Sequence, residues 1–173
     1  MEGVAHVLPD VLMPNLRIVF CGTAAGTVSA KRQAYYAHPQ NKFWRTLKAV
    51  ELTPWLVSPE DYRMLLEFGL GLTDLAKSES GMDHQLPAGS LGKNARANLQ
   101  AKIESFQPRV LAFTSLAAGR RFLGPSAALG DSNERIGETR LWVLPSPSPA
   151  AHWNWDQSWW LRLAKEAGSV RKG

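Results

Sequence analysis

Residues 17–26 read RIVFCGTAAG, and this stretch decides the class of fold. The β-branched and aromatic run from Arg17 to Cys21 is typical of a buried strand, and Gly22 ends it. Strand-like runs at residues 71–76, 109–114 and 139–144 follow, separated by stretches with helical periodicity. This alternation predicts an α/β three-layer sandwich, in which a central, mainly parallel four-stranded sheet is flanked by helices.

Helical patterns occupy residues 42–52, 58–68, 94–106, 116–122 and 156–167. Asn41 suits the N-cap of the first helix, and Ser58 followed by Pro59 suits the start of the second. We expect residues 124–133 to form a loop. No internal repeat or linker interrupts the pattern, so residues 1–173 are expected to fold as one domain.

The composition limits the class of protein but does not identify a binding partner. The net charge is +5 and the pI is near 9.6, which fits an anionic partner such as nucleic acid but equally a mildly basic soluble protein. The single cysteine, Cys21, excludes an internal disulfide. We expect no metal and no cofactor, because no His, Cys and carboxylate grouping has ligand spacing. Short apolar runs and the absence of a secretory start predict a cytoplasmic protein without membrane contact. We also expect a monomer.

Functional loops of a parallel sheet lie beyond the carboxyl ends of its strands. Three segments meet that condition in this sequence: residues 22–40, the stretch after Thr114, and residues 145–154. Candidate site residues are therefore sought first in these three loops.

The loops carry motifs of a known family. Residues 19–26, VFCGTAAG, resemble the first motif of the mismatch-specific uracil- and thymine-DNA glycosylases. Residues 35–44, YYAHPQNKFW, are similar to those enzymes and more closely to the deoxyinosine (hypoxanthine) glycosylases. Residues 144–150, LPSPSPA, resemble the insertion loop of the same superfamily, and residues 71–75, GLTDL, match a segment between them. The ordered set identifies the chain as a member of the uracil-DNA glycosylase superfamily.

The resemblance implies a monofunctional DNA glycosylase. Such an enzyme flips a deaminated base, most often uracil, out of DNA and hydrolyses its N-glycosidic bond to initiate base excision repair. Two alternatives stay open: a hypoxanthine-DNA glycosylase, and a non-catalytic protein that binds damaged bases or abasic sites. A small-molecule nucleotide enzyme is disfavoured, because the first loop lacks the residues of a phosphate-binding loop.

The resemblance also implies roles for particular residues. Backbone amides around the first loop would stabilise the departing base, Tyr36 would stack on it, and Ser115 would contact its edge; the implied base-binding set is Gly22, Thr23, Ala24, Tyr36 and Ser115. The insertion loop would press on the DNA backbone. Ala150 is small at the position of the intercalating side chain, and His152 or Trp153 would replace that wedge; the implied DNA-binding set is Ser146, Pro147, Ser148, Ala150 and His152.

One position departs from the family pattern. The mismatch-specific enzymes carry an asparagine that positions the attacking water where this chain has Ala24. Alanine has no polar side chain, so another group must position the water. The candidate catalytic residues are Asn41, Asp74 and Asp83, and backbone groups alone are a further alternative.

Overall fold

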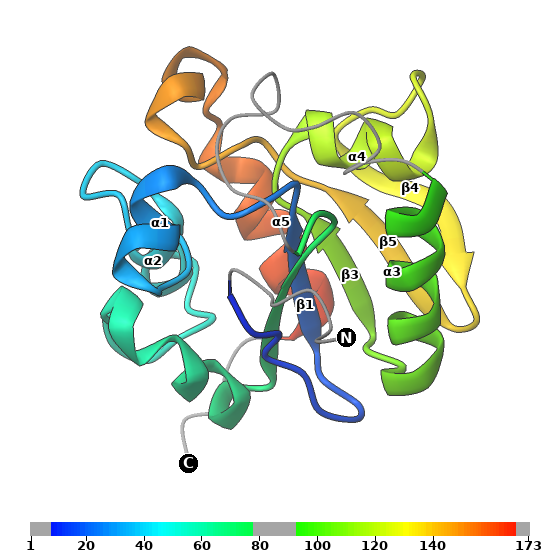
Figure 1. Cartoon of the computed structure of the whole chain (residues 1–173), viewed down its shortest axis with the longest axis horizontal. Helices are drawn as coiled ribbons and strands as arrows, with labels where there is room; N and C mark the ends of the chain where they lie inside the picture. The colour runs from blue at the N-terminus through cyan, green and yellow to red at the C-terminus, as the bar shows by residue number, and fades with distance from the viewer. Residues whose placement is uncertain (1–7, 78–92, 169–173) are drawn as a thin grey trace, which may run out of the picture.

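The fold was analysed in a computed structural model, which describes residues 8–77 and 93–168 (Figure 1). The helices are α1 (Thr27–Arg32), α2 (Phe43–Ala49), α3 (Lys93–Phe106), α4 (Leu116–Leu123) and α5 (Gln157–Ala167). Two 3₁₀ segments are η1 (Pro59–Phe68) and η3 (Pro149–Asn154). The strands are β1 (Ile18–Gly22), β2 (Leu70–Asp74), β3 (Val110–Phe113), β4 (Gly130–Ile136) and β5 (Thr139–Val143).

The strands form one sheet in the order β2-β1-β3-β5-β4. The pairs β1–β2, β1–β3 and β3–β5 are parallel, whereas β4 runs antiparallel to β5. The register places Gly22 beside Asp74 and Cys21 beside Phe113. Four carboxyl ends therefore meet at one edge of the sheet, the upper edge in Figure 1, where η3 also lies.

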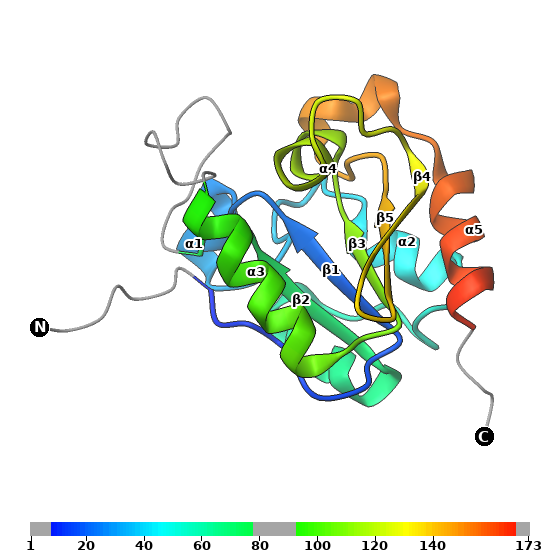
Figure 2. The same ribbon diagram turned by 90° about the vertical axis from the view of Figure 1, so that its right-hand side faces the viewer.

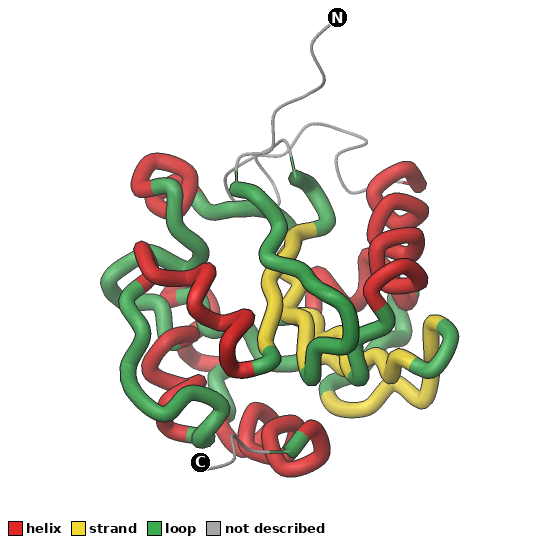
Figure 3. The backbone as a smooth tube through the Cα atoms, turned by 90° about the horizontal axis from the view of Figure 1, so that it is seen from below, coloured by secondary structure: helices red, strands yellow, loops and turns green. Residues whose placement is uncertain are grey.

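Helices cover both faces of the sheet, as Figures 2 and 3 show. Successive side chains of β1 point to opposite faces of the sheet. They therefore belong to two different apolar clusters, one on each face. Ile18 and Phe20 pack with α2, η1 and α5, and Val19 and Cys21 pack with α3 and α4. The predicted three-layer α/β sandwich is confirmed.

The sheet has five strands, so the predicted number of four is wrong. The predicted loop 124–133 contains the beginning of β4, which forms a hairpin with β5 through Gly137, at a φ of 58°. β4 reads GDSNERI, and only its two terminal residues are buried. An edge strand open to solvent carries no continuous apolar run, so periodicity gives no signal for it.

Other local differences follow from short-range geometry. The loop predicted over residues 22–40 contains the short helix α1. The segment after Ser58 is 3₁₀ rather than α-helical, with a kink at Asp61, and the Ser58 side chain makes no capping hydrogen bond. None of the helices in the described ranges is long and apolar enough to cross a bilayer.

Candidate active site

Three adjacent strand ends bring polar groups together at the carboxyl edge of the sheet. Gly22 ends β1, Asp74 ends β2, and the two residues are register partners. Thr114 directly follows β3, and its amide donates to the Cys21 carbonyl at 2.9 Å. This edge is where open α/β sheets bind ligands.

Gly22, which has no side chain, lies at the centre of this polar group. A Cβ at Gly22 would lie 2.8 Å from Asp74 Oδ1. It would also lie 3.5 Å from Thr114 Oγ1 and 3.5 Å from Tyr36 Oη. A side chain at this position would collide with Asp74, so only glycine fits where these three polar side chains meet.

Asp74 is the buried carboxylate of the site. Its side chain is 6% exposed. Burial raises its pKa from 3.8 to about 6, because removing water penalises the charged form. The nearby Lys77 ammonium opposes this rise, and the Asp10 carboxylate adds to it. A carboxyl group with a pKa near neutrality, at a ligand-binding edge, is a candidate acid or base.

Tyr36 forms one wall beside Gly22. Its backbone is left-handed, with a φ of 49°. One face of its ring stacks on Phe43, with centroids 4.0 Å apart. Its hydroxyl shares a 2.9 Å hydrogen bond with Thr114 Oγ1, and burial, followed by the charge of Asp74, raises its pKa well above the usual value. The ring is held in one orientation and is half-buried.

The first loop contributes backbone carbonyls and amides at the strand ends. The Gly22 carbonyl accepts from Leu75, and the Thr23 carbonyl accepts from Ala76. Among the described residues, the amides of Thr23 and Ala24 have no hydrogen-bond acceptor. Both residues are half-buried, so these amides sit beside the site without being locked into the sheet.

Asn41 and Ser115, two of the predicted site residues, serve at helix starts. Asn41 Oδ1 accepts from the Phe43 amide at 2.9 Å, which satisfies a free donor at the beginning of α2. Ser115 is the N-cap of α4, and its hydroxyl accepts from the Ala118 amide at 2.9 Å. Each oxygen is thus engaged, although the Asn41 amide nitrogen and the Ser115 hydroxyl proton are not used by these bonds.

The serine- and proline-rich loop packs against the start of α2. The Pro147 carbonyl accepts from the Lys42 amide at 2.9 Å, and Pro147 is buried. The hydroxyls of Ser146 and Ser148 accept backbone amides two residues later, which stiffens the loop. Pro147 therefore shapes the loop from inside, while the half-buried serines reach its surface.

The tip of the same loop is exposed. Ala150 and His152 are exposed, and Trp153 is 77% exposed. The His152 and Trp153 rings stack, with centroids 5.7 Å apart. The tip of the loop therefore presents this aromatic pair to solvent.

Four residues remain to be compared with the sequence predictions. Asp83, the third catalytic candidate, lies outside the described residues. Thr114, Lys77 and Asp10 belong to the polar group at the strand ends but were not among the predicted site residues. Thr114 was predicted as the last residue of the strand 109–114, whereas β3 ends at Phe113, so the search of the stretch after Thr114 missed it. Asp10 lies in a segment that no motif covers.

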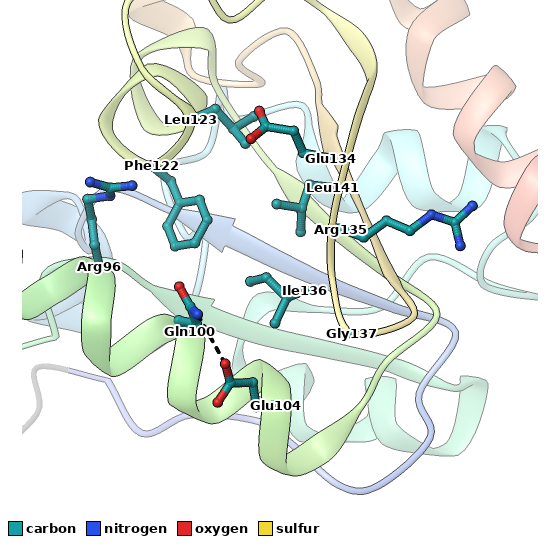
Figure 4. A pocket seen from close by; sticks show the side chains of 10 residues that line it. All are labelled: Arg96, Gln100, Glu104, Phe122, Leu123, Glu134, Arg135, Ile136, Gly137 and Leu141. Carbon is teal, nitrogen blue, oxygen red and sulfur yellow. Dashed lines mark hydrogen bonds between the residues drawn. The ribbon is translucent and has the colours of Figure 1, made fainter.

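A separate hollow lies between α3, α4 and the β4–β5 hairpin (Figure 4). Its walls include two basic and two acidic side chains, Arg96, Arg135, Glu104 and Glu134. None of its lining residues belongs to the group around Gly22. Across residues 8–77 and 93–168, no cluster of three or more His, Cys, Asp or Glu side chains is placed to hold a metal ion.

The fold and the strand-end site define an α/β sandwich protein with a ligand-binding edge beside a buried carboxylate. Comparison with known proteins places it in a family. The profile of the uracil DNA glycosylase superfamily matches residues 9–167, and the chain belongs to this superfamily. The fold resembles the solution NMR structure of a candidate uracil DNA glycosylase from Methanosarcina acetivorans, with a TM-score of 0.65 and 20% identity over 95% of this chain and 98% of that chain. Membership indicates a DNA glycosylase, which is a hydrolase that acts on DNA.

Proposed function

We propose that this protein excises uracil from DNA by hydrolysing the N-glycosidic bond and leaves an abasic site. The observation that carries the proposal is the buried Asp74 carboxylate, whose Oδ1 lies against Gly22 at the carboxyl edge of the sheet. This group supplies a polar side chain that Ala24 lacks. Its position supports a direct role in the chemistry rather than in packing.

The reaction begins with a base drawn out of the helix into the space beside Gly22. Tyr36 stacks on the base with the ring face that points away from Phe43. The Thr114 and Ser115 hydroxyls contact the edge of the base. Base stacking on an aromatic ring contributes about 1–3 kcal/mol. The fixed ring orientation of Tyr36 supports this assignment, because no rotamer entropy is lost on binding.

Bond cleavage moves negative charge onto uracil and positive charge onto the sugar. The C1′–N1 electron pair leaves with uracil, and the Thr23 and Ala24 amides donate hydrogen bonds to that anion. The Asp74 carboxylate stabilises the cation-like sugar. It then accepts a proton from the water whose oxygen bonds to C1′. These roles require ionised Asp74, so uracil excision increases as the pH rises through about 6.

DNA is held by the exposed tip of the serine- and proline-rich loop. Trp153 inserts as the wedge that fills the space left by the flipped base, since apolar side chains unstack base steps in this way. The hydroxyls of Ser146 and Ser148 retain protons that can be donated to phosphate oxygens. A DNA substrate also places the protein inside the cell.

A labelled duplex with one uracil tests this proposal. Incubation with excess protein followed by alkaline cleavage should give strand scission at the uracil, together with release of free uracil. The control duplex carries thymine at the same position. Asp74→Asn should lose about 10²-fold or more in single-turnover rate, whereas Asp61→Asn, at an exposed site on η1, should not. Intact DNA under excess protein would rule out uracil excision.

Hypoxanthine is the second candidate base. Residues 35–44 favour it, as does the Asp74 carboxyl, which keeps its proton up to about pH 6 and so is able to protonate a purine leaving group. Excision of hypoxanthine would then increase as the pH falls, opposite to the uracil reaction. Running both substrates between about pH 5 and 9 separates the two. Tight binding to uracil DNA without release of any base would instead support the non-catalytic binder that Ala24 left open.

A further inference from the structure

Lys77 lies in the turn after β2, enclosed by polar groups. Its Nζ is 3.0 Å from Asp10 Oδ1 and 3.7 Å from Asp74 Oδ2. It donates a 2.7 Å hydrogen bond to the Tyr35 hydroxyl. Only 9% of its side chain is exposed. A lysine this deeply enclosed is held in one conformation and acts as a fixed charge rather than as a solvated surface group.

Asp10 reaches Lys77 because the N-terminal segment lies along β2. Val11 and Leu72 exchange two backbone hydrogen bonds of 2.9 Å in an antiparallel bridge. A Cβ at Gly71 would stand 2.5 Å from the Val11 carbonyl oxygen, so glycine is required for this approach. The segment is further held by the Tyr35 hydroxyl, which donates to the Pro9 carbonyl at 3.1 Å.

Asp10 is itself held from two further sides. Thr73 Oγ1 donates to its Oδ1 at 2.7 Å, and Lys102 of α3 approaches its Oδ2 at 2.7 Å. Burial would raise the pKa of Asp10, but the charge of Lys77 and the bonds from Lys102 and Thr73 outweigh burial and hold the pKa below its usual value. Lys77 therefore faces one firmly ionised carboxylate and one carboxyl, Asp74, that titrates near neutrality.

We propose that Lys77 is a positioning residue of the active site: fixed by Asp10 and Tyr35, its ammonium orients the Asp74 carboxylate toward Gly22 and balances its charge. The inference rests on the proposed function for its effect on catalysis. Lys77 favours the ionised form of Asp74, whereas Asp10 opposes it. The N-terminal segment thus contributes to the chemistry without touching the substrate.

The charged and titratable groups that face Asp74 come from every element packed around it. Among the described residues they are Lys77 from the turn after β2, Asp10 from the N-terminal segment, Lys102 from α3, Cys21 from β1, and Tyr35 and Tyr36 from the segment between α1 and α2. Lys77 and Asp10 are ion-pair partners with opposite effects on Asp74. Removing Lys77 or Asp10 should therefore shift the titration of Asp74 in opposite directions.

The test measures, in single variants, the pH at which the Asp74 carboxyl is half ionised (its midpoint). Lys77→Met removes the charge that favours ionised Asp74, so the midpoint should rise by about one pH unit or more. Asp10→Asn removes the charge that opposes ionisation, so the midpoint should fall. Lys77→Arg keeps the charge and should stay close to wild type. Lys165→Met removes an exposed lysine from α5 and is the matched control, with no change expected.

Two readouts keep this inference separable from the proposed function. The first is the pH profile of single-turnover excision from uracil-containing duplex. The second is the ¹³C NMR titration of the Asp74 side-chain carboxyl in the full-length protein, which needs no activity. If wild-type protein excises no base, the proposed function fails, and the NMR midpoints still decide the role of Lys77.

Opposite shifts for Lys77→Met and Asp10→Asn, with rescue by Lys77→Arg, would establish the positioning role. A residue that only supports the fold would give losses of rate in both variants at every pH, with no opposed movement of the midpoint. Midpoints that stay at the wild-type value, or move in the same direction, would overturn the proposal. Should Lys77→Met fail to fold, Asp10→Asn and Lys77→Arg alone still give the predicted fall and the predicted constancy.

Discussion

Replacing Asp74 with asparagine is expected to remove activity and, at the same time, to stabilise the protein at alkaline pH. The carboxyl is buried beside Gly22, and its pKa rises from 3.8 in an exposed chain to about 6 in the fold. This is a difference of about two pH units, and each unit corresponds to about 1.4 kcal/mol. Ionised Asp74 therefore costs the folded state about 3 kcal/mol above pH 6.

The sign of the effect follows from proton binding. Between about pH 4 and 6 the folded protein holds a proton on Asp74 that the unfolded chain has lost, so the free energy of unfolding decreases as the pH rises through this window. Asparagine does not titrate, and Asp74→Asn avoids the decrease. Because the buried amide also needs hydrogen bonds, we expect a gain of about 1–3 kcal/mol at pH 8 that disappears toward pH 4.

Urea denaturation of both proteins at several pH values measures this difference directly. Subtracting the two stability curves cancels the titration of groups that do not interact with Asp74. Asp61→Asn, at an exposed position, is the matched control and should change stability by less than about 0.5 kcal/mol at any pH. The reasoning is refuted if Asp74→Asn is less stable than wild type at pH 8, or if the difference does not depend on pH.

Three further changes probe the remaining groups of the site. Gly22→Ala places a Cβ 2.8 Å from Asp74 Oδ1 and should lower the excision rate at least about 10-fold, whereas Gly26→Ala, with no atom within 4 Å, should not; equal rates would contradict the site. Tyr36→Ala should weaken uracil-DNA binding by about 1–3 kcal/mol, and Tyr36→Phe should keep most of it; unchanged binding by the alanine variant argues against stacking. Trp153→Ala should raise the Kd for uracil duplex in a fluorescence-anisotropy titration without lowering Tm, since the ring is exposed; a lower Tm would assign the ring to packing.

The fold was largely predictable because buried strands leave a strong trace in sequence. The runs that became β1, β3 and β5 are mainly apolar because both faces of the sheet are covered. Glycine ends the first run, and proline follows the last. β4 left no such trace, since its pairing with β5 depends on backbone hydrogen bonds rather than on apolar side chains. An edge strand of this kind can be recognised only when the strand that it pairs with is known.

The site was predictable only in part. The strand-end rule and the family motifs both pointed to Gly22 and Tyr36, and Asp74 was a candidate because Ala24 cannot position the water. The structure brings these three residues together. Asn41 was predicted as the N-cap of α2, but the structure places Lys42 there, and Asn41 accepts from the Phe43 amide from one residue earlier. Ser115, predicted to contact the base, is the N-cap of α4. The approach of Asp10 to Lys77 depends on a backbone bridge between distant segments, which no local pattern encodes.

The account depends most on the claim that ionised Asp74 acts on the sugar beside Gly22. Single-turnover release of uracil from duplex DNA, measured from about pH 5 to 9 for wild type and Asp74→Asn, tests that claim. The account predicts a wild-type rate that increases through a midpoint near pH 6 and an Asp74→Asn rate about 10²-fold or more lower, without that increase. An Asp74→Asn enzyme with the wild-type rate and the wild-type pH profile would contradict it.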